Sequence, residues 1–140
     1  MIRYELIPHT ADIRLKVSGA TKEELFTAAL QGMASIIKKD MQANKITETN
    51  EIKKEIKIKL PDLTSLLIDF LSEVLTACHT QKTVFCSVAF LKLNENELHA
   101  IIKGAKVDAF DEDIKAVTYH EADVRKNASG DLETVIVFDI

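Results

Sequence analysis

Three short stretches of the sequence carry polar side chains that could do chemistry. The first is HTAD, which places His9 and Asp12 at a connector between two expected strands. The second is IKAVTYH, in which Lys115 interrupts an apolar segment, and the third is VIVFDI, which contains Asp139 and Ile140. Carboxylates are hard oxygen ligands of the kind that Mg²⁺, Ca²⁺ and Mn²⁺ prefer. Neighbouring carboxylates, such as the side chain of Asp139 and the α-carboxylate of Ile140, repel one another. Their presence therefore predicts either a solvated sheet edge or an acidic metal site.

Each of these side chains also has a structural interpretation. His9 could cap the turn after Pro8, and Asp12 could cap the entry to a strand. Lys115 could extend its ammonium group into solvent while its stem packs on apolar neighbours, or it could pair with carboxylates. Asp62 stands at a helix N-cap by position, so a functional role for it needs separate evidence. Structural roles are expected for the remaining histidines, which are His79, His99 and His120.

The hydrophobic pattern indicates which elements must position these side chains. Alternation of apolar and polar residues predicts strands at residues 2–7, 12–19, 51–60, 83–93, 98–108, 114–126 and 132–140. Helical periodicity predicts helices at residues 21–40 and 62–80, and Thr21 with Glu24 forms a capping box at the first of them. The order β-β-α-β-α-β-β-β-β predicts an α+β fold. In it, two helices pack on a mainly antiparallel β-sheet, within a single domain over residues 1–140.

Composition argues against several classes of function. The chain has 140 residues and a formal net charge of −4, whereas charge-driven binding to nucleic acid needs a basic surface. The sequence contains neither a run of apolar residues long enough to cross a bilayer nor a signal peptide. We therefore expect a cytoplasmic protein without a membrane partner. Cys78 and Cys86 are too few and too far apart for a metal knuckle, so buried, reduced thiols are expected.

Four motifs together resemble those of the archease family. HTADI lies near the N-terminus, LTSLLIDFLSEVL in the middle and IKAVTYH late in the chain, and VIVFDI comes last. The resemblance covers essentially the whole chain, with the motifs in the family's order and spacing. It implies that Asp12 and Asp139 bind a divalent metal ion such as Ca²⁺, Mg²⁺ or Mn²⁺, and that Lys115 is a third functional side chain. Further candidates by motif are His9, Asp62 and the α-carboxylate of Ile140.

The function that this resemblance implies is an accessory one. Archeases stimulate the RtcB-type RNA ligase, which joins tRNA exon halves through a GTP-dependent guanylylated intermediate. A member of the family is therefore expected to promote guanylylation and multiple turnover of the ligase, without catalysis of its own. It would meet tRNA only indirectly, through the ligase.

Two other functions stay open at this point. A metal-dependent hydrolase or nuclease acting alone would also use carboxylates, a lysine and a metal ion, and turnover by the isolated protein would identify it. However, the sequence has no HExxH motif and no phosphate-binding glycine-rich loop. A chaperone-like binding module would tolerate replacement of Asp12 and Asp139, and would need a large exposed apolar patch. The chain also departs from the family pattern at Gly104-Ala105, where members often carry Gly-Glu.

Overall fold

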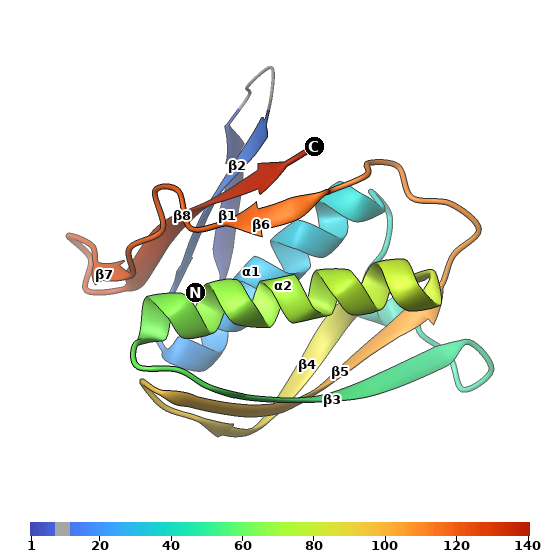
Figure 1. Ribbon diagram of the computed structural model, residues 1–140, viewed down its shortest axis with the longest axis horizontal. Helices are drawn as coiled ribbons and strands as arrows, with labels where there is room; N and C mark the ends of the chain where they lie inside the picture. Colours follow the sequence, from blue (N-terminus) through green and yellow to red (C-terminus); the bar gives the residue numbers. More distant parts are fainter. Residues whose placement is uncertain (8–11) are drawn as a thin grey trace.

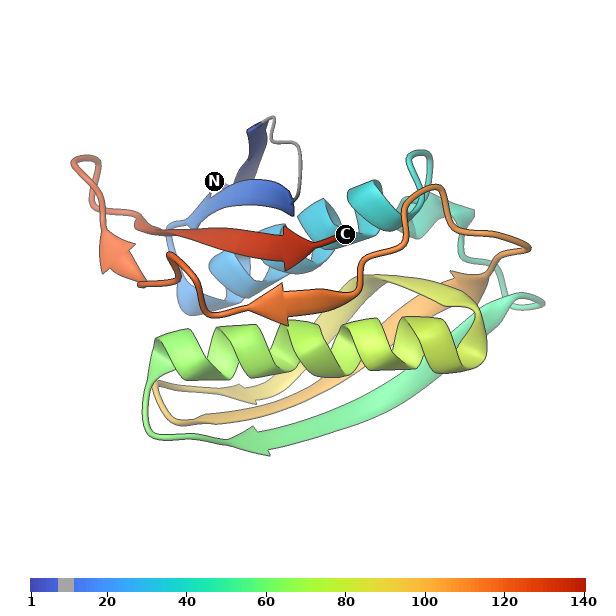
Figure 2. The ribbon, with the colours of Figure 1, turned by 45° about the horizontal axis from the view of Figure 1, so that its top comes forward.

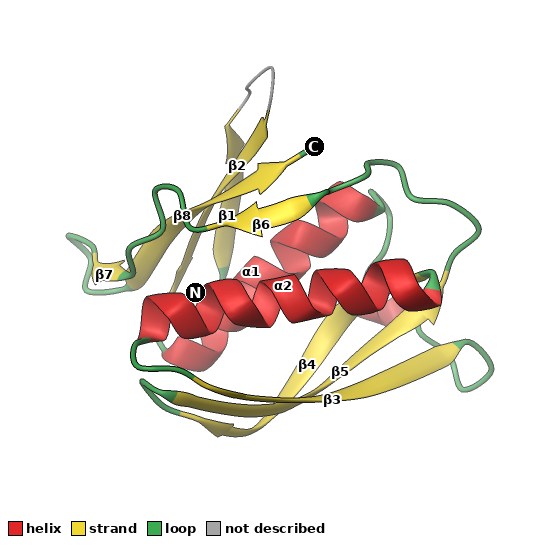
Figure 3. Ribbon diagram, in the orientation of Figure 1, coloured by secondary structure: helices red, strands yellow, loops and turns green. Residues whose placement is uncertain are grey.

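Two helices lie between two β-sheets in the computed structural model, which describes residues 1–7 and 12–140 (Figures 1 and 3). The helices are α1 (Lys22–Ile37) and α2 (Leu63–Gln81), and η1 (Ala43–Lys45) is a short 3-10 helix. The strands are β1 (Arg3–Ile7), β2 (Asp12–Gly19), β3 (Glu51–Lys59), β4 (Thr83–Leu93), β5 (Glu97–Lys106), β6 (Ala116–Thr118), β7 (Arg125–Lys126) and β8 (Leu132–Asp139).

All strand pairs of the described chain are antiparallel, and they form two sheets. Sheet A has the order β1-β2-β8-β6, with β7 also paired to β8, and sheet B has the order β3-β5-β4. Helix α1 contacts β2 and β4, and α2 contacts β6 and β3, so the helices form the middle layer (Figure 2). The predicted α+β class is confirmed, with the strands divided between two sheets.

The helices begin where the sequence predicts, because their first N–H groups are capped by side chains. The hydroxyl of Thr21 accepts a hydrogen bond from the N–H of Glu24 at 3.1 Å. The carboxylate of Asp62 accepts one from the N–H of Ser65 at 2.8 Å. Each cap satisfies a donor that has no partner within its helix. None of the described helices is long and apolar enough to cross a membrane.

The apolar faces of the helices and sheets meet in one core. Phe26 of α1 and Phe70 of α2, both fully buried in this core, form an aromatic cluster with the partly buried Phe90 of β4. The ring centroids of Phe26 lie 5.8 Å from Phe70 and 6.3 Å from Phe90. This cluster joins both helices to sheet B, and the core side of sheet A is closed by buried residues such as Leu15 and Phe138.

The strand predicted at residues 114–126 is broken into two short strands, β6 and β7, and between them the chain leaves the sheet. Glu121 in this segment has a φ of 67°, a left-handed conformation that a strand does not accommodate. The backbone N–H of Val124 donates to the hydroxyl oxygen of Thr64 at 3.0 Å instead of to a neighbouring strand. At Val124, a side-chain acceptor on α2 therefore takes the place of a strand partner.

Candidate functional site

Three strands of sheet A converge where Asp12 begins β2 and Asp139 ends β8. In the antiparallel register the two aspartates are direct partners, and Ala116 at the start of β6 is paired with Asp139 from the other side. The backbone N–H of Lys115 donates to the carbonyl oxygen of Asp139 at 2.7 Å. The structure therefore brings Asp12, Lys115 and Asp139 to one end of sheet A, beside the end marked C in Figure 2.

The side chains of Asp12 and Asp139 project from the same face of sheet A. Directly opposed residues of an antiparallel pair share a face, with Cβ atoms about 4.5–5.5 Å apart. The next pair along, Ile13 and Phe138, points to the other face, where Phe138 is fully buried against the core. The aspartates therefore point away from the helices. Asp12 is half-buried there and Asp139 is exposed.

The donors at this position suit a hard divalent cation at an open site. Two opposed carboxylates offer oxygen ligands of the kind that Ca²⁺ and Mg²⁺ take, and a cation between them would relieve their repulsion. In residues 1–7 and 12–140, no group of three or more His, Cys, Asp or Glu side chains is arranged to hold a metal ion. The other positions around a cation at Asp12 and Asp139 would therefore need water, main-chain oxygens or atoms of another molecule.

An arginine that sequence reasoning missed lies one row inward from the aspartates. Arg14 follows Asp12 on the same face of β2 and makes a two-point ion pair with Glu121. Its Nε lies 2.9 Å from Oε2 and its Nη2 lies 2.7 Å from Oε1. The hydrogen bond with Glu121 raises the pKa of Arg14 above its ordinary value, and the charge of Asp12 contributes in the same direction. Arg14 therefore adds positive potential beside Asp12 while its guanidinium binds Glu121.

Comparison with known proteins adds a second line of evidence. The model of the Archease protein family matches residues 4–140. This chain belongs to the archease family. Protein archease of Methanosarcina mazei is 34% identical to it, over 96% of this chain and 94% of the relative. Protein archease of Pyrococcus abyssi is 32% identical, over 100% of both chains. The resemblance inferred from the four motifs is confirmed.

Two solved structures share the fold. Protein 1598 of Methanobacterium thermoautotrophicum, whose structure was determined in solution, aligns with a TM-score of 0.68 at 24% identity, over 98% of each chain. The crystal structure of an archease from Thermotoga maritima, described as a possible chaperone, aligns with a TM-score of 0.64 at 22% identity. That alignment covers 97% of this chain and 96% of the other. The arrangement of two helices between two sheets is thus shared with other archeases.

Lys115 is exposed, and the peptide group that joins it to Ile114 is held from two sides by neighbouring elements. The carbonyl oxygen of the preceding residue, Ile114, lies 2.9 Å from Nε2 of His79 on α2. The ring of His79 in turn packs edge-on against Phe110, with centroids 5.6 Å apart. Helix α2 and strand β8 therefore anchor the segment from which the Lys115 side chain extends. Sequence reasoning placed His79 only at a helix end and missed this contact.

The three remaining candidates from the sequence are Asp62, His9 and Ile140. Asp62 caps the first turn of α2, whereas His79, near the other end of that helix, contacts Ile114 beside Lys115. Asp62 therefore lies roughly 25 Å from His79 along the helix axis. His9 lies outside the described residues. Ile140 directly follows Asp139 and is half-buried, so its carboxylate stays a candidate ligand by position.

Proposed function

We propose that this archease activates an RtcB-type RNA ligase by promoting its guanylylation and multiple turnover. The observation that carries the proposal is the direct pairing of Asp12 with Asp139 beside Lys115, in a chain that belongs to the archease family. On this proposal the chemical step takes place on the ligase, and the archease supplies charged groups without catalysis of its own. Contact with tRNA would then be indirect, through the ligase.

Asp12 and Asp139 are the residues that we propose hold a divalent cation, with the carboxylate of Ile140 as a further ligand. A cation bound there would supply charge neutralisation to phosphate groups. The exposed ammonium of Lys115 would contact a phosphate or carboxylate of the partner. Arg14 does not compete for this role, because its guanidinium is paired at two points with Glu121.

A stand-alone hydrolase gains no support from the two thiols. Burial raises the pKa of Cys78 to about 11 and raises that of Cys86 in the same direction. Both side chains are buried, so neither is a nucleophile at neutral pH. Isolated protein that hydrolysed nucleotides or RNA with a bound divalent cation would nevertheless favour the hydrolase over the activator.

The experiment that tests the activator is GTP-dependent guanylylation and multiple-turnover ligation by the matching RtcB-type ligase, with substoichiometric archease. We expect repeated turnover with the wild type, and stimulation lowered by about tenfold or more in Asp12→Asn, Asp139→Asn and Lys115→Ala. Asp131→Asn, immediately before the other end of β8, and Lys126→Ala, on β7, are matched controls that should stimulate normally.

Circular dichroism and thermal unfolding establish that each variant is folded. Normal stimulation by folded Asp12→Asn and Asp139→Asn would refute the acidic site, and would favour a chaperone-like module that does not use these carboxylates. No stimulation by the wild type would refute activation itself.

A further inference from the structure

The strand β1 leaves an edge of sheet A without a partner strand within the described ranges. It pairs with β2 on one side and stands at the end of the order β1-β2-β8-β6. The unpaired N–H and C=O groups of such an edge can bind another strand, and exposed lysines commonly protect against this. Strand β3, at an edge of sheet B, carries the exposed Lys53 and Lys57. Strand β1 has no lysine, and two of its large hydrophobic side chains, Tyr4 and Leu6, are 43% and 52% exposed.

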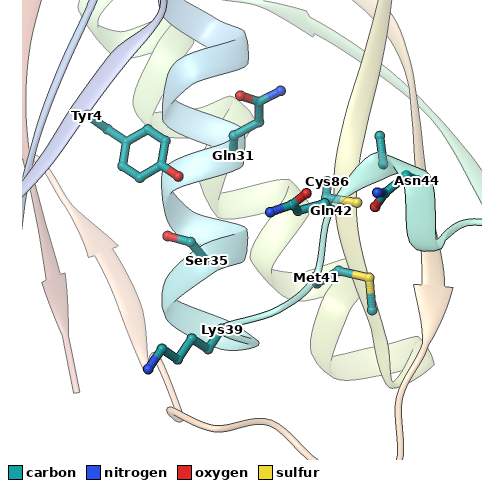
Figure 4. A pocket seen from close by; sticks show the side chains of 9 residues that line it. Tyr4, Gln31, Ser35, Lys39, Met41, Gln42, Asn44 and Cys86 are labelled. Atoms are coloured by element: carbon teal, nitrogen blue, oxygen red, sulfur yellow. The ribbon is translucent and has the colours of Figure 1, made fainter.

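The apolar face of β1 overlooks a groove along α1. In the register of sheet A, Tyr4 and Leu6 share the face of the buried Val17 and Leu15. Figure 4 shows the ring of Tyr4 extending from β1 toward α1, on the side where Ser35 and Lys39 lie. Two cavities of about 460 and 580 Å³ adjoin each other there, because Ser35 and Lys39 line both. An open groove therefore lies beside β1, between the apolar face of this edge strand and helix α1.

The opposite face of β1 carries charges that complement a second copy of the same strand. Arg3 and Glu5 are two residues apart and both exposed. In an antiparallel pair of β1 strands centred on Tyr4, Arg3 of each copy lies opposite Glu5 of the other. The same register places Tyr4 opposite Tyr4 and Ile2 opposite Leu6. Ion pairs on one face then accompany aromatic and apolar pairs on the other, and each kind stabilises a sheet.

Neighbouring registers lack this complementarity. A pair centred on Glu5 would place the two copies of Glu5 opposite each other, and a pair centred on Arg3 would do the same with Arg3. Like charges directly opposite each other destabilise a sheet. A shift by one residue would place the charged face of one copy beside the apolar face of the other. The sequence of β1 thus selects the register centred on Tyr4.

We propose that β1 is a self-association surface, at which a second copy of this chain adds its own β1 in the antiparallel register centred on Tyr4. Adjacent strands lie about 4.8 Å apart, so the two β2 strands would be roughly 14 Å apart across the joined sheet. Helices pack at about 8–10 Å, so the two α1 helices beneath these strands have room. The Tyr4, Leu6 and Ile2 side chains of both copies fill the space between them.

The strand contact is small, so the dimer is weak and concentration-dependent. Strand β1 has 5 residues, and a stable interface commonly buries at least about 1,200 Å². We expect a dissociation constant roughly between 1 µM and 1 mM, which sedimentation equilibrium can measure on the full chain.

Charge reversal tests the register. Arg3→Glu leaves β1 with two acidic residues, and Glu5→Arg leaves it with two basic residues. In a dimer of either variant, residues 3 and 5 of the two copies then place like charges directly opposite each other. We expect the dissociation constant of each to rise about tenfold or more, and an equimolar mixture of the two to dimerise again. Glu95→Arg, a charge change in the exposed β4–β5 turn, is the matched control and should dimerise as the wild type does.

Circular dichroism checks both variants, because Glu5 lies opposite Lys16 of β2 in the register of the folded sheet. A wild type that stays monomeric up to about 1 mM would overturn the proposal. So would dimers unaffected by either reversal, or folded single variants whose mixture fails to associate. Restoration in the mixture supports the proposed register, and protection of the Arg3–Ile7 amides from hydrogen exchange at high concentration would support it independently.

Discussion

Replacing Asp139 by asparagine should change the stability of the protein in opposite directions with and without a divalent cation. Asp139 lies directly opposite Asp12, and like charges so placed destabilise a sheet by about 0.2–1 kcal/mol. Asparagine keeps the shape of the side chain, and the backbone contact with the N–H of Lys115 is retained. In a chelator, we therefore expect the variant to be more stable by about 0.5 kcal/mol, which raises Tm by roughly 2 °C.

An excess of Ca²⁺ or Mg²⁺ should reverse this order. A cation at 100 times its dissociation constant stabilises the folded state by about 2.7 kcal/mol, and only the wild type offers both carboxylates. The wild type should then exceed Asp139→Asn by about 2 kcal/mol. Urea or thermal unfolding in chelator and in a cation series measures both differences. Asp131→Asn removes an aspartate immediately before the other end of β8 and should show neither effect.

Two results would refute the reasoning about this pair. Equal stabilisation of the wild type and Asp139→Asn by the cation would show that the cation binds elsewhere. A variant less stable than the wild type in chelator would show that Asp139 makes a favourable interaction that outweighs its repulsion from Asp12.

Four further predictions concern the surroundings of the site and the core. His79→Ala should lower the free energy of unfolding by about 1 kcal/mol, because the carbonyl of Ile114 loses its hydrogen bond. A change in this free energy smaller than about 0.3 kcal/mol, measured by urea unfolding, would contradict the prediction. Gly104→Ala should cost about 1–3 kcal/mol in the same assay, since a Cβ there would overlap the carbonyl oxygen of Val84. Burial raises the pKa of Cys78 to about 11 from 9.0, so a disulfide reagent at pH 8 should label it about 100-fold more slowly than in the unfolded chain. Because the unfolded state loses this proton first, stability should also fall as the pH rises from about 9 toward 11.

Features that depend on neighbours in sequence could be predicted from the sequence. The caps at Thr21 and Asp62 place the helix starts correctly, because a capping side chain acts within three residues. Strand alternation placed β2 and β8 correctly and put Asp12 and Asp139 at their ends. That these ends meet is a non-local pairing, which alternation alone does not indicate. The motif resemblance supplied that expectation.

The contacts that sequence reasoning missed join distant segments through single side chains. Arg14 and Glu121 are 107 residues apart, and the φ of 67° at Glu121 interrupts a segment that alternates like a strand. His79 and Ile114 are 35 residues apart, and their contact joins a ring nitrogen to a backbone carbonyl, which leaves no pattern in either segment. The division of the strands into two sheets likewise depends on which strands pair and which sheet faces the helices cover, and each strand taken alone has the same periodicity.

The position of β8 within sheet A has a consequence for folding. It lies between β2 and β6, so the strand nearest the end of the sequence completes a sheet that the first strands begin. Contacts of such long sequence separation form slowly, because much of the chain must be ordered before they contribute. Sheet B and the two helices can assemble earlier on the ribosome, at a stage when the edge of β2 that faces away from β1 has no partner strand. Asp12 and Asp139 are brought together only by the pairing of β8 with β2, so a chain that has not formed this pairing does not present the acidic pair to a partner.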